Sequence, residues 1–440
     1  MERQYKDSGI EWIGKIPESW EVKRLKNLCT SNTSLIVDGD WIESPDISDE
    51  GIRYYTTGNI GDGVFKRQGN GFITESTFQT LNCTPVYPGD LVFSRLNSPI
   101  GRSCIIPDDY PICVVAVDNV IVRLDSKYDK RFIMYISMCP GYQETNMLIA
   151  RGTTMQRMSR TQLQNVDMPI PLLSEQQRIA DYLDEKCGEI DSLIALQEQM
   201  IEKLKAYKQS VITEAVTKGL DPNAKLVPSG IDWIGEIPEG WNITVLRRFA
   251  NIILGKMLQP NARSENDSIE QYICAKDVHF EGIDTSDLKK MYFNKTEKEI
   301  YQVQKGDLLV VEGGAGAAGS CVLKTDLPNT YIQNSIMIVR PKQGIDIRYI
   351  HYYEFSLVKK GYVDYVCNKA TIPHFTKDKL SSMPIPFPPL SEQQAIASYL
   401  DEKCADIDHL IALKQKKIDS LKEYKKSVIY EAVTGKTIIE

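Results

Sequence analysis

The feature that most limits what this chain can fold into is an internal repeat that spans nearly all of it. The segment 8–18, SGIEWIGKIPE, returns at 229–239 as SGIDWIGEIPE, and the segment 174–217 returns at 391–434 with 30 of 44 positions identical. Between these anchors the likeness is faint. The chain therefore alternates two diverged units, about 20–168 and 241–385, with two similar units, about 174–218 and 391–435.

This pattern suggests that the similar units do one job twice, while the diverged units do different jobs. A recent duplication without functional meaning is the plain alternative, but it would not explain why only one kind of unit has diverged.

Each similar unit is predicted to be one long helix. The motif SEQQ opens both units, and it predicts a capping box in which Ser174 and Ser391 cap the helix with Gln177 and Gln394 three residues later. Gly219 should end the first helix. About 42 residues at 1.5 Å each give a rod of roughly 60 Å.

Apolar residues recur with a heptad period along both helices, interrupted by polar residues at the same layers, Gln197/Lys414 and Lys208/Lys425. A sustained 3.5-residue period with polar layers is typical of a coiled coil, and we expect the two helices to pack as an antiparallel pair. Several apolar residues lie off this seam and face either a separate partner or the diverged units: Leu193, Leu196, Met200, Leu410 and Leu413.

The diverged units combine short strands and helices, which predicts an α+β protein with two mixed α/β domains. The segments 89–94 and 306–311 each look like a turn followed by a buried strand, and further strands are expected at 114–117 and 120–122. The segments 132–136 and 349–353 are expected to be helical.

Composition excludes several classes of protein. With 42% hydrophobic and 25% charged residues, the chain is neither disordered nor collagenous. The polar start predicts no secretory signal, and no apolar run approaches the length of a membrane span, so we expect a cytoplasmic protein. The ten cysteines form no CxxC pair and are expected to be reduced and mostly buried. The four histidines are never paired at ligand spacing, which argues against a zinc site.

Three short motifs look like enzyme signatures but lack the required context. The segment 314–319 matches the dinucleotide fingerprint G-x-G-x-x-G, yet the residues after it predict a strand where that fingerprint needs a helix. Gly435-Lys436-Thr437 ends a helix and lacks the earlier glycine of a phosphate loop. The segment 387–390, FPPL, lacks the Asn or Asp of an amino-methyltransferase site. The sequence thus predicts no catalytic centre.

Three loop-like segments in the diverged units are rich in groups that contact phosphates or base edges. The net charge of −7 does not exclude such local basic faces. The alternative is a solvated basic surface. The candidate DNA-contacting residues are Arg95, Asn97, Arg102, Arg151, Thr153, Arg157 and Arg160 in the first unit, and Lys369, Thr371, His374, Lys377 and Lys379 in the second.

The repeated W-I-G-x-I-P-x-x-W motif, the P-x-P-x-x-x-E-Q-Q run before each helix and the alternating diverged units resemble the specificity subunit of type I restriction-modification systems. The resemblance covers essentially the whole chain. It implies target-recognition domains at 1–168 and 221–388 that each read half of a bipartite site in double-stranded DNA. It also implies spacer helices at 169–220 and 389–440 that dock two modification (methyltransferase) subunits, through which restriction (translocase-nuclease) subunits join.

On this resemblance S-adenosylmethionine, ATP and Mg belong to the partner subunits, and the chain itself holds no cofactor. The glycine-rich loop at 313–319 stands where the first domain has Arg95 to Arg102, so the two domains are not expected to contact DNA identically there. Two alternatives remain open: the recognition subunit of a related system that cleaves on both sides of its site, and a coiled-coil scaffold that binds proteins instead of DNA.

Overall fold

In the computed structural model the described residues are 3–152, 155–314, 316–367 and 373–439. The chain divides into two compact units, which we call the first unit (Met1–Glu198 with Lys416–Glu440) and the second unit (Gln199–Gln415). Each unit contains one diverged repeat and part of both long helices. Among the described residues no helix is both long enough and apolar enough to span a bilayer.

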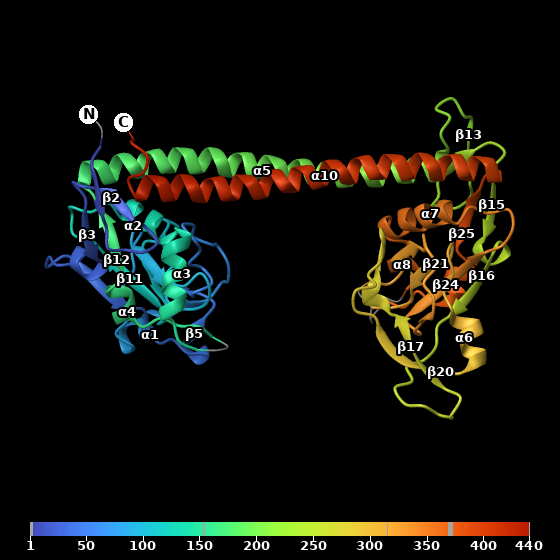
Figure 1. The fold of residues 1–440 in the computed structure, drawn as a ribbon, viewed down its shortest axis with the longest axis horizontal. Coiled ribbons are helices and arrows are strands. Elements are labelled where there is room, and N and C mark those ends of the chain that lie inside the picture. Colours follow the sequence, from blue (N-terminus) through green and yellow to red (C-terminus); the bar gives the residue numbers. More distant parts are fainter. Residues whose placement is uncertain (1–2, 153–154, 315, 368–372, 440) are drawn as a thin grey trace. The chain divides into compact units, whose positions relative to one another are not determined.

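The first unit is built around a four-stranded antiparallel sheet with the order β4-β11-β8-β9. Its strand β11 is labelled in Figure 1. These strands are β4 (Leu35–Asp38), β8 (Leu91–Ser94), β9 (Ser103–Ile105) and β11 (Asn119–Arg123). Leu91 and Phe93 of β8 pack into one core cluster and Val92 into another. The strand is an unbroken apolar run because both faces of its sheet are covered.

Other elements of the first unit cover this sheet or join it to the helices. A second sheet has the order β10-β6-β7-β5, and strands β3 and β12 form an antiparallel ribbon at the two ends of the diverged repeat. The bounds are β1 (Tyr5–Asp7), β2 (Lys15–Pro17), β3 (Glu21–Arg24), β5 (Ile47–Ser48), β6 (Ile52–Tyr55), β7 (Phe72–Ile73), β10 (Cys113–Val115), β12 (Asp167–Ile170), α1 (Glu75–Thr80), α2 (Lys130–Ser137), α3 (Pro140–Ile149) and α4 (Arg160–Gln164).

The second unit repeats this plan with the sheet β16-β24-β21-β22 and the ribbon β15–β25. The strands and helices predicted at 306–311, 320–322 and 349–353 are all present. The bounds are β13 (Leu226–Pro228), β14 (Glu236–Pro238), β15 (Asn242–Val245), β16 (Ala250–Leu254), β17 (Ser268–Ile273), β18 (Val278–His279), β19 (Gly282–Ile283), β20 (Lys289–Phe293), β21 (Leu308–Val311), β22 (Ser320–Val322), β23 (Thr330–Ile332), β24 (Ile336–Pro341), β25 (Pro384–Phe387), α6 (Lys295–Tyr301), α7 (Ile347–Lys359), α8 (Tyr362–Val366) and α9 (Lys377–Ser381).

The two long helices are α5 (Leu173–Lys218, 46 residues) and α10 (Leu390–Val433, 44 residues), as predicted, and α5 ends just before Gly219. The predicted capping box is wrong, because both helices begin one residue before the serine of SEQQ. The first glutamine of each SEQQ motif makes tertiary hydrogen bonds instead. Gln176 donates to the Pro171 carbonyl at 2.9 Å, and its side-chain oxygen accepts from the Asp129 amide at 2.8 Å. Gln393 repeats both contacts in the second unit.

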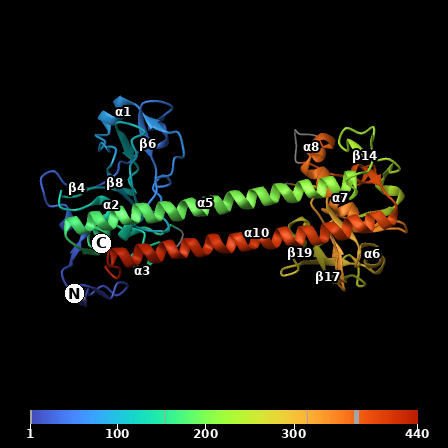
Figure 2. The same cartoon turned by 90° about the horizontal axis from the view of Figure 1, so that it is seen from above.

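Within each unit α5 and α10 lie side by side (Figure 2), and an ion pair of the same kind joins them. Lys425 of α10 donates to Asp191 of α5 at 2.7 Å in the first unit, and Lys208 of α5 donates to Asp408 of α10 at 2.7 Å in the second. In the first unit the last turn of α10, at Val433, packs in the same core cluster as Ile179 near the start of α5. Within that unit the two helices are therefore antiparallel.

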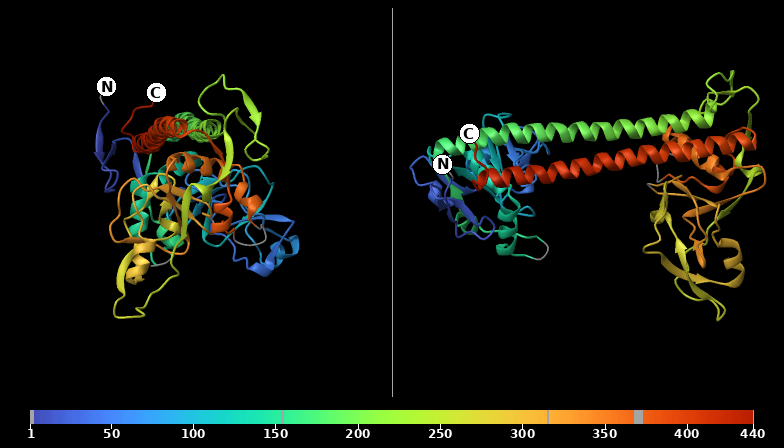
Figure 3. Two further views of the ribbon diagram at one scale, coloured as in Figure 1. Left: turned by 90° about the vertical axis from the view of Figure 1, so that its right-hand side faces the viewer. Right: turned by 45° about the horizontal axis from the view of Figure 1, so that its top comes forward.

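Both ends of the chain belong to the first unit, where the views of Figure 3 show them near the end of α10. The Tyr5 hydroxyl donates to the Gly435 carbonyl at 3.2 Å. Gly435 has a positive φ of 71°, and a Cβ there would lie 2.5 Å from Pro17 Cγ. Only glycine fits this turn, because a side chain would collide with the segment that carries the repeated tryptophan motif.

Candidate nucleic-acid interface

The basic loops predicted in the first unit meet at one end of its main sheet. Because neighbouring strands are antiparallel, the C-terminal ends of β4 and β8 lie beside the N-terminal ends of β11 and β9. The segment 151–160 joins the same end, since Leu96 and Arg157 form a β-bridge and the Met158 amide donates to the Arg95 carbonyl at 3.0 Å. We call this end of the sheet the loop edge; in the first unit it comprises residues 39–41, 95–102, 118–119, 151–152 and 155–160.

The second unit has a loop edge of the same construction. The Phe375 amide donates to the Glu312 carbonyl at 2.6 Å, and Gly313 and His374 form a β-bridge. These contacts make Phe375 the counterpart of Met158, and His374 the counterpart of Arg157. A Cβ at Gly313 would lie 2.8 Å from His374 Nδ1, so glycine is needed for this approach. The second loop edge comprises the described residues among 255–258, 312–319, 334–335 and 373–379.

Two of the predicted arginines lie inside the protein. Arg95 is 4% exposed, donates to the carbonyls of Met158 (3.1 Å) and Val117 (2.8 Å), and pairs with Asp38 at 2.9 Å. Arg102 is 9% exposed and donates to five backbone carbonyls, those of Thr57, Ile60, Leu96, Asn97 and Pro99. Burial lowers the pKa of both guanidinium groups. Both side chains stabilise the loops from within the protein and are not available for direct contact with DNA.

The other described candidates of the first unit are at the surface. Asn97, Arg151, Arg157 and Arg160 are exposed. Arg157 pairs with Asp118 at 2.7 Å. Arg160 pairs with Asp38 at 3.3 Å. Exposed pairs of this kind are weak, so a phosphate can replace the carboxylate partner at little cost. Thr153 lies outside the described residues.

In the second unit His374 and Lys377 are exposed. Lys379 is half-buried and donates to the His374 carbonyl at 2.8 Å, which ties it to the backbone of the same loop. Lys369 and Thr371 lie outside the described residues.

Sequence reasoning missed two large apolar side chains at the loop edges. Trp41 is 67% exposed in the first unit and Met257 is 74% exposed in the second. The signal was present in the sequence, because each residue follows a strand by a glycine and one polar residue: Gly39-Asp40-Trp41 and Gly255-Lys256-Met257.

The glycine-rich segment comes between β21 and β22 in the chain, and these two strands pair antiparallel. No helix follows it, as the sequence predicted, so it lacks the helix N-terminus that a dinucleotide pyrophosphate needs.

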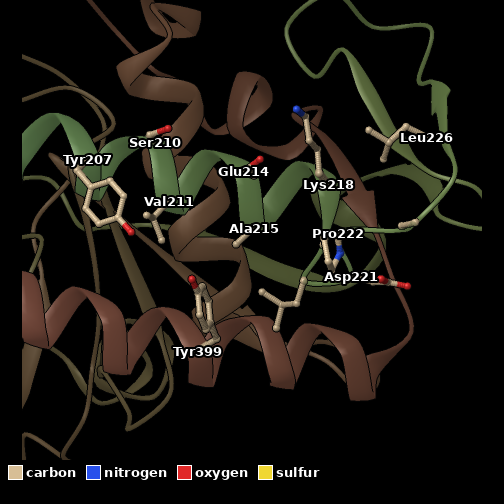
Figure 4. Close-up of a pocket in the computed structure, with 13 residues that line it drawn as sticks. Tyr207, Ser210, Val211, Glu214, Ala215, Lys218, Asp221, Pro222, Leu226 and Tyr399 are labelled. Carbon is tan, nitrogen blue, oxygen red and sulfur yellow. The ribbon is translucent and has the colours of Figure 1, made fainter.

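A cavity of about 680 Å³ opens beside the C-terminal end of α5 in the second unit (Figure 4). It is lined by residues 219–222 and by side chains that include Tyr207, Glu214, Lys218 and Tyr399. Its lining contains none of the predicted DNA-contacting residues that the structure describes. Among the described residues, no group of three or more His, Cys, Asp or Glu side chains is arranged to hold a metal ion. The ten cysteines are unpaired and all but Cys29 and Cys274 are buried, as predicted.

One buried cluster combines residue types found in hydrolase sites. Ser320 Oγ lies 3.1 Å from His351 Nδ1 and also donates to Glu354. In a catalytic triad the acid orients the base, whereas here acid and base both bond the serine, and all three side chains are at most 6% exposed. The equivalent pair in the first unit is Ser103 with Ser137, 2.8 Å apart. The cluster is therefore a buried polar contact between β22 and α7.

This cluster should make the second unit less stable at high pH. Burial raises the pKa of Glu354 to about 8 from its ordinary 4.5, so the folded chain keeps a proton that the unfolded chain has released. Between these values the Glu354 contribution to the free energy of unfolding should fall by up to about 1.4 kcal/mol per pH unit. Burial also lowers the pKa of His351 to about 4, which contributes with the opposite sign below its ordinary 6.5, so the net loss should be seen from about pH 6.5 to 8. Glu354→Gln should remove that slope, and Glu281→Gln, at an exposed glutamate, should not. Urea denaturation at pH 5 to 8 measures it; equal slopes in Glu354→Gln and wild type would contradict the assignment.

The off-seam leucines predicted to contact a partner are exposed. Leu193 and Leu196 on α5 are 47% and 45% exposed, and Leu410 and Leu413 on α10 are 45% and 50% exposed. Met200 is half-buried. The heptad positions Leu183, Ile190, Leu400 and Ile407 are buried. The same two leucine positions are thus exposed in both copies of the helix.

Two α/β domains, each ending in a polar loop edge and each joined to a repeated long helix, define a protein with two recognition surfaces. Comparison with known proteins gives the class. A model of the type I restriction modification DNA specificity domain matches residues 17–206 and again residues 238–423. The chain therefore belongs to this family, with two copies of the domain, and the function of the family is DNA sequence specificity.

Curated relatives agree with this assignment to the family. The chain is 26% identical over 438 residues to a putative type I restriction enzyme MjaX specificity subunit of Methanocaldococcus jannaschii, covering 96% of this chain and 95% of the relative. It is 25% identical over 368 residues to the EcoBI specificity subunit of Escherichia coli, covering 80% of this chain and 74% of that relative.

Two solved structures share the fold. One is a chain from a structure of type I R-M system assembly, with a TM-score of 0.72 and 17% identity over 96% of this chain and 99% of that one. The other is the HsdS subunit of Thermoanaerobacter tengcongensis, with a TM-score of 0.52 and 17% identity over 96% and 98%.

Proposed function

We propose that this chain is the non-catalytic specificity subunit of a type I restriction-modification complex and reads a bipartite site in double-stranded DNA. The observation that carries the proposal is the duplicated specificity domain, with an exposed polar loop edge in each copy. In this proposal each loop edge contacts one half-site in the major groove, because exposed Arg, Lys, His and Asn side chains suit phosphates and base edges.

The proposal assigns contacts to the exposed candidates and to half-buried Lys379. In the first half-site these are Asn97, Arg151, Arg157 and Arg160, with Thr153 added from the sequence; in the second they are His374, Lys377 and Lys379, with Lys369 and Thr371 added from the sequence. Arg95 and Arg102 position the first loop edge from within.

The long helices supply the second part of the proposal. We propose that α5 and α10 form an antiparallel coiled coil with pseudo-two-fold symmetry, which sets the distance between half-sites. The repeated ion pairs Lys425–Asp191 and Lys208–Asp408 support this. The uncovered leucine positions on both copies would each dock one modification subunit. S-adenosylmethionine, ATP and Mg would then act in the partner subunits.

Methylation sequencing tests this function directly. The chain produced with its modification partner should modify one bipartite sequence, and the purified chain alone should transfer no methyl groups. The logarithm of its binding constant for a duplex that carries the mapped site should fall linearly with the logarithm of salt concentration, because phosphate contacts release counterions. A protein scaffold would show no such dependence. Modification without a consensus site, or methyl transfer by the isolated chain, would contradict the proposal.

A further inference from the structure

The exposed apolar residues Trp41 and Met257 occupy equivalent positions in the two units. The Gly39 amide donates to the Asn119 carbonyl and the Asp40 amide to the Val115 carbonyl, both at 2.8 Å. In the second unit Gly255 donates to the Ile336 carbonyl at 3.0 Å, and Lys256 to the Ile332 carbonyl at 3.1 Å. The same pair of backbone bonds thus precedes an exposed apolar side chain in both units, although the sequences there have diverged.

These backbone bonds also fix the direction in which the chain leaves the strand. A Cβ at Gly39 would lie 2.3 Å from the Val115 carbonyl oxygen, and one at Gly255 would lie 2.3 Å from that of Gln333. Because glycine has no Cβ, the end of each strand can lie close to the backbone carbonyl groups of the neighbouring segment. Trp41 itself is held by a bond from its Nε1 to Glu43 Oε1 at 2.9 Å. Because this bond restricts the indole ring, Trp41 has little conformational entropy to lose when a partner binds.

Both side chains lie on loop edges that also carry exposed cationic residues. In the first unit Asp38, at the end of the strand that leads to Trp41, pairs with exposed Arg160 and with buried Arg95. In the second unit the Lys256 carbonyl accepts from the Asn334 amide at 2.8 Å, and the Ser335 carbonyl accepts from the amide of Glu312, whose own carbonyl holds the loop that carries His374 and exposed Lys377. An exposed apolar side chain at the same position of both units, on edges that carry cations, favours a polyanion with apolar groups as the partner.

We propose that Trp41 and Met257 contact DNA bases, each within its own half-site, and so help to determine which base is accepted there. This rests on the proposed function. Bases are the apolar part of a polyanionic duplex, and an indole ring or a thioether meets either a base face or a thymine methyl. In this proposal the charged side chains of the loop edges contact the DNA phosphates, while Trp41 and Met257 supply the contacts that depend on base identity.

The test uses the full chain assembled with its modification partner and a duplex that carries the mapped site. Trp41→Ala should weaken binding to this duplex roughly 10- to 100-fold, in line with an aromatic side chain on a base, and should change binding to a random duplex less than threefold. Met257→Ala should act in the same direction. In methylation sequencing, each variant should relax base preference in one half-site only, and the two variants should affect different half-sites.

Tyr87→Ala is the matched control. Tyr87 is also an exposed aromatic residue (45%) on the first unit, but it precedes β8 and so lies at the opposite end of the same sheet. This variant should bind the mapped duplex like the wild type.

A second measurement does not depend on any variant folding. Trp41 is far more exposed than Trp20 (0%) and Trp241 (8%), and Trp12 and Trp233 are half-buried. The mapped duplex should therefore reduce acrylamide quenching of the wild-type tryptophan fluorescence.

The proposal is overturned if the wild type modifies a bipartite site while both variants keep its affinity and base preference. It is also overturned if Trp41→Ala loses only assembly with the modification subunit, because the apolar residue then serves a protein partner. Absence of any specific site for the wild type would instead refute the proposed function.

Discussion

Replacing Arg102 by methionine should destabilise the first loop edge by about 3–5 kcal/mol, because a buried cation with five carbonyl partners would be lost at once. Methionine keeps an unbranched apolar stem and cannot donate a hydrogen bond, so the carbonyls of residues 57, 60, 96, 97 and 99 would lose this donor. Hydrogen exchange of the peptide 91–105 measures the effect locally, and the peptide 308–322 of the second unit serves as the internal reference.

Arg151→Met is the matched control for this prediction. Arg151 is exposed, and its loop contacts with Arg157 are made by backbone groups. It should change stability by less than about 0.5 kcal/mol while weakening DNA binding. If Arg102→Met left hydrogen exchange unchanged and reduced only DNA affinity, then the interior role that we assign to Arg102 would be wrong.

Exchanging residues 22–168 for the matching segment of a relative should replace one half-site completely and leave the other unchanged. The two ends of this segment lie side by side, because β3 pairs with β12 with Val22 opposite Pro169 and Lys23 opposite Met168. A substituted domain therefore enters and leaves the protein at one fixed place, and its base contacts travel with it. Methylation sequencing of the exchanged complex provides the readout.

The corresponding exchange in the second unit, between β15 and β25, is the reciprocal control. It should replace the other half-site and leave the first. Simultaneous change of both half-sites in either chimera would show that the two domains do not read DNA independently.

Elements with strong local signals could be predicted from the sequence. The long helices, the strands after Gly89 and Gly306, and helices α2 and α7 are all present where the pattern placed them. The failure at the helix starts has a local cause. Ser174 fits a capping box by spacing, but Gln176 gains two buried hydrogen bonds when the helix begins one residue earlier. Tertiary contacts decided the boundary, and a single sequence does not show them.

The loop edge was only partly predictable for the same reason. The loops around Arg95 and Arg151 looked basic and exposed, and they do come together. The sequence did not show that Arg102 is surrounded by carbonyls from Thr57 and Ile60, more than 40 residues away in the chain. Trp41 was missed because an aromatic residue after a strand ordinarily indicates core, and the shared glycine–polar–apolar spacing in the two units does not by itself show that both side chains are exposed.

The paired salt bridges between the long helices have a consequence for the ancestry of this protein. Lys208 and Lys425 are the same position of the repeat, and so are Asp191 and Asp408. The contact is isologous, since each repeat offers the same lysine and the same aspartate to the other. A single repeat thus carries both partners of this contact, so two separate copies of it could form both salt bridges. Such a homodimer would recognise an inverted repeat in DNA, whereas two copies within one chain leave each half free to acquire a target of its own.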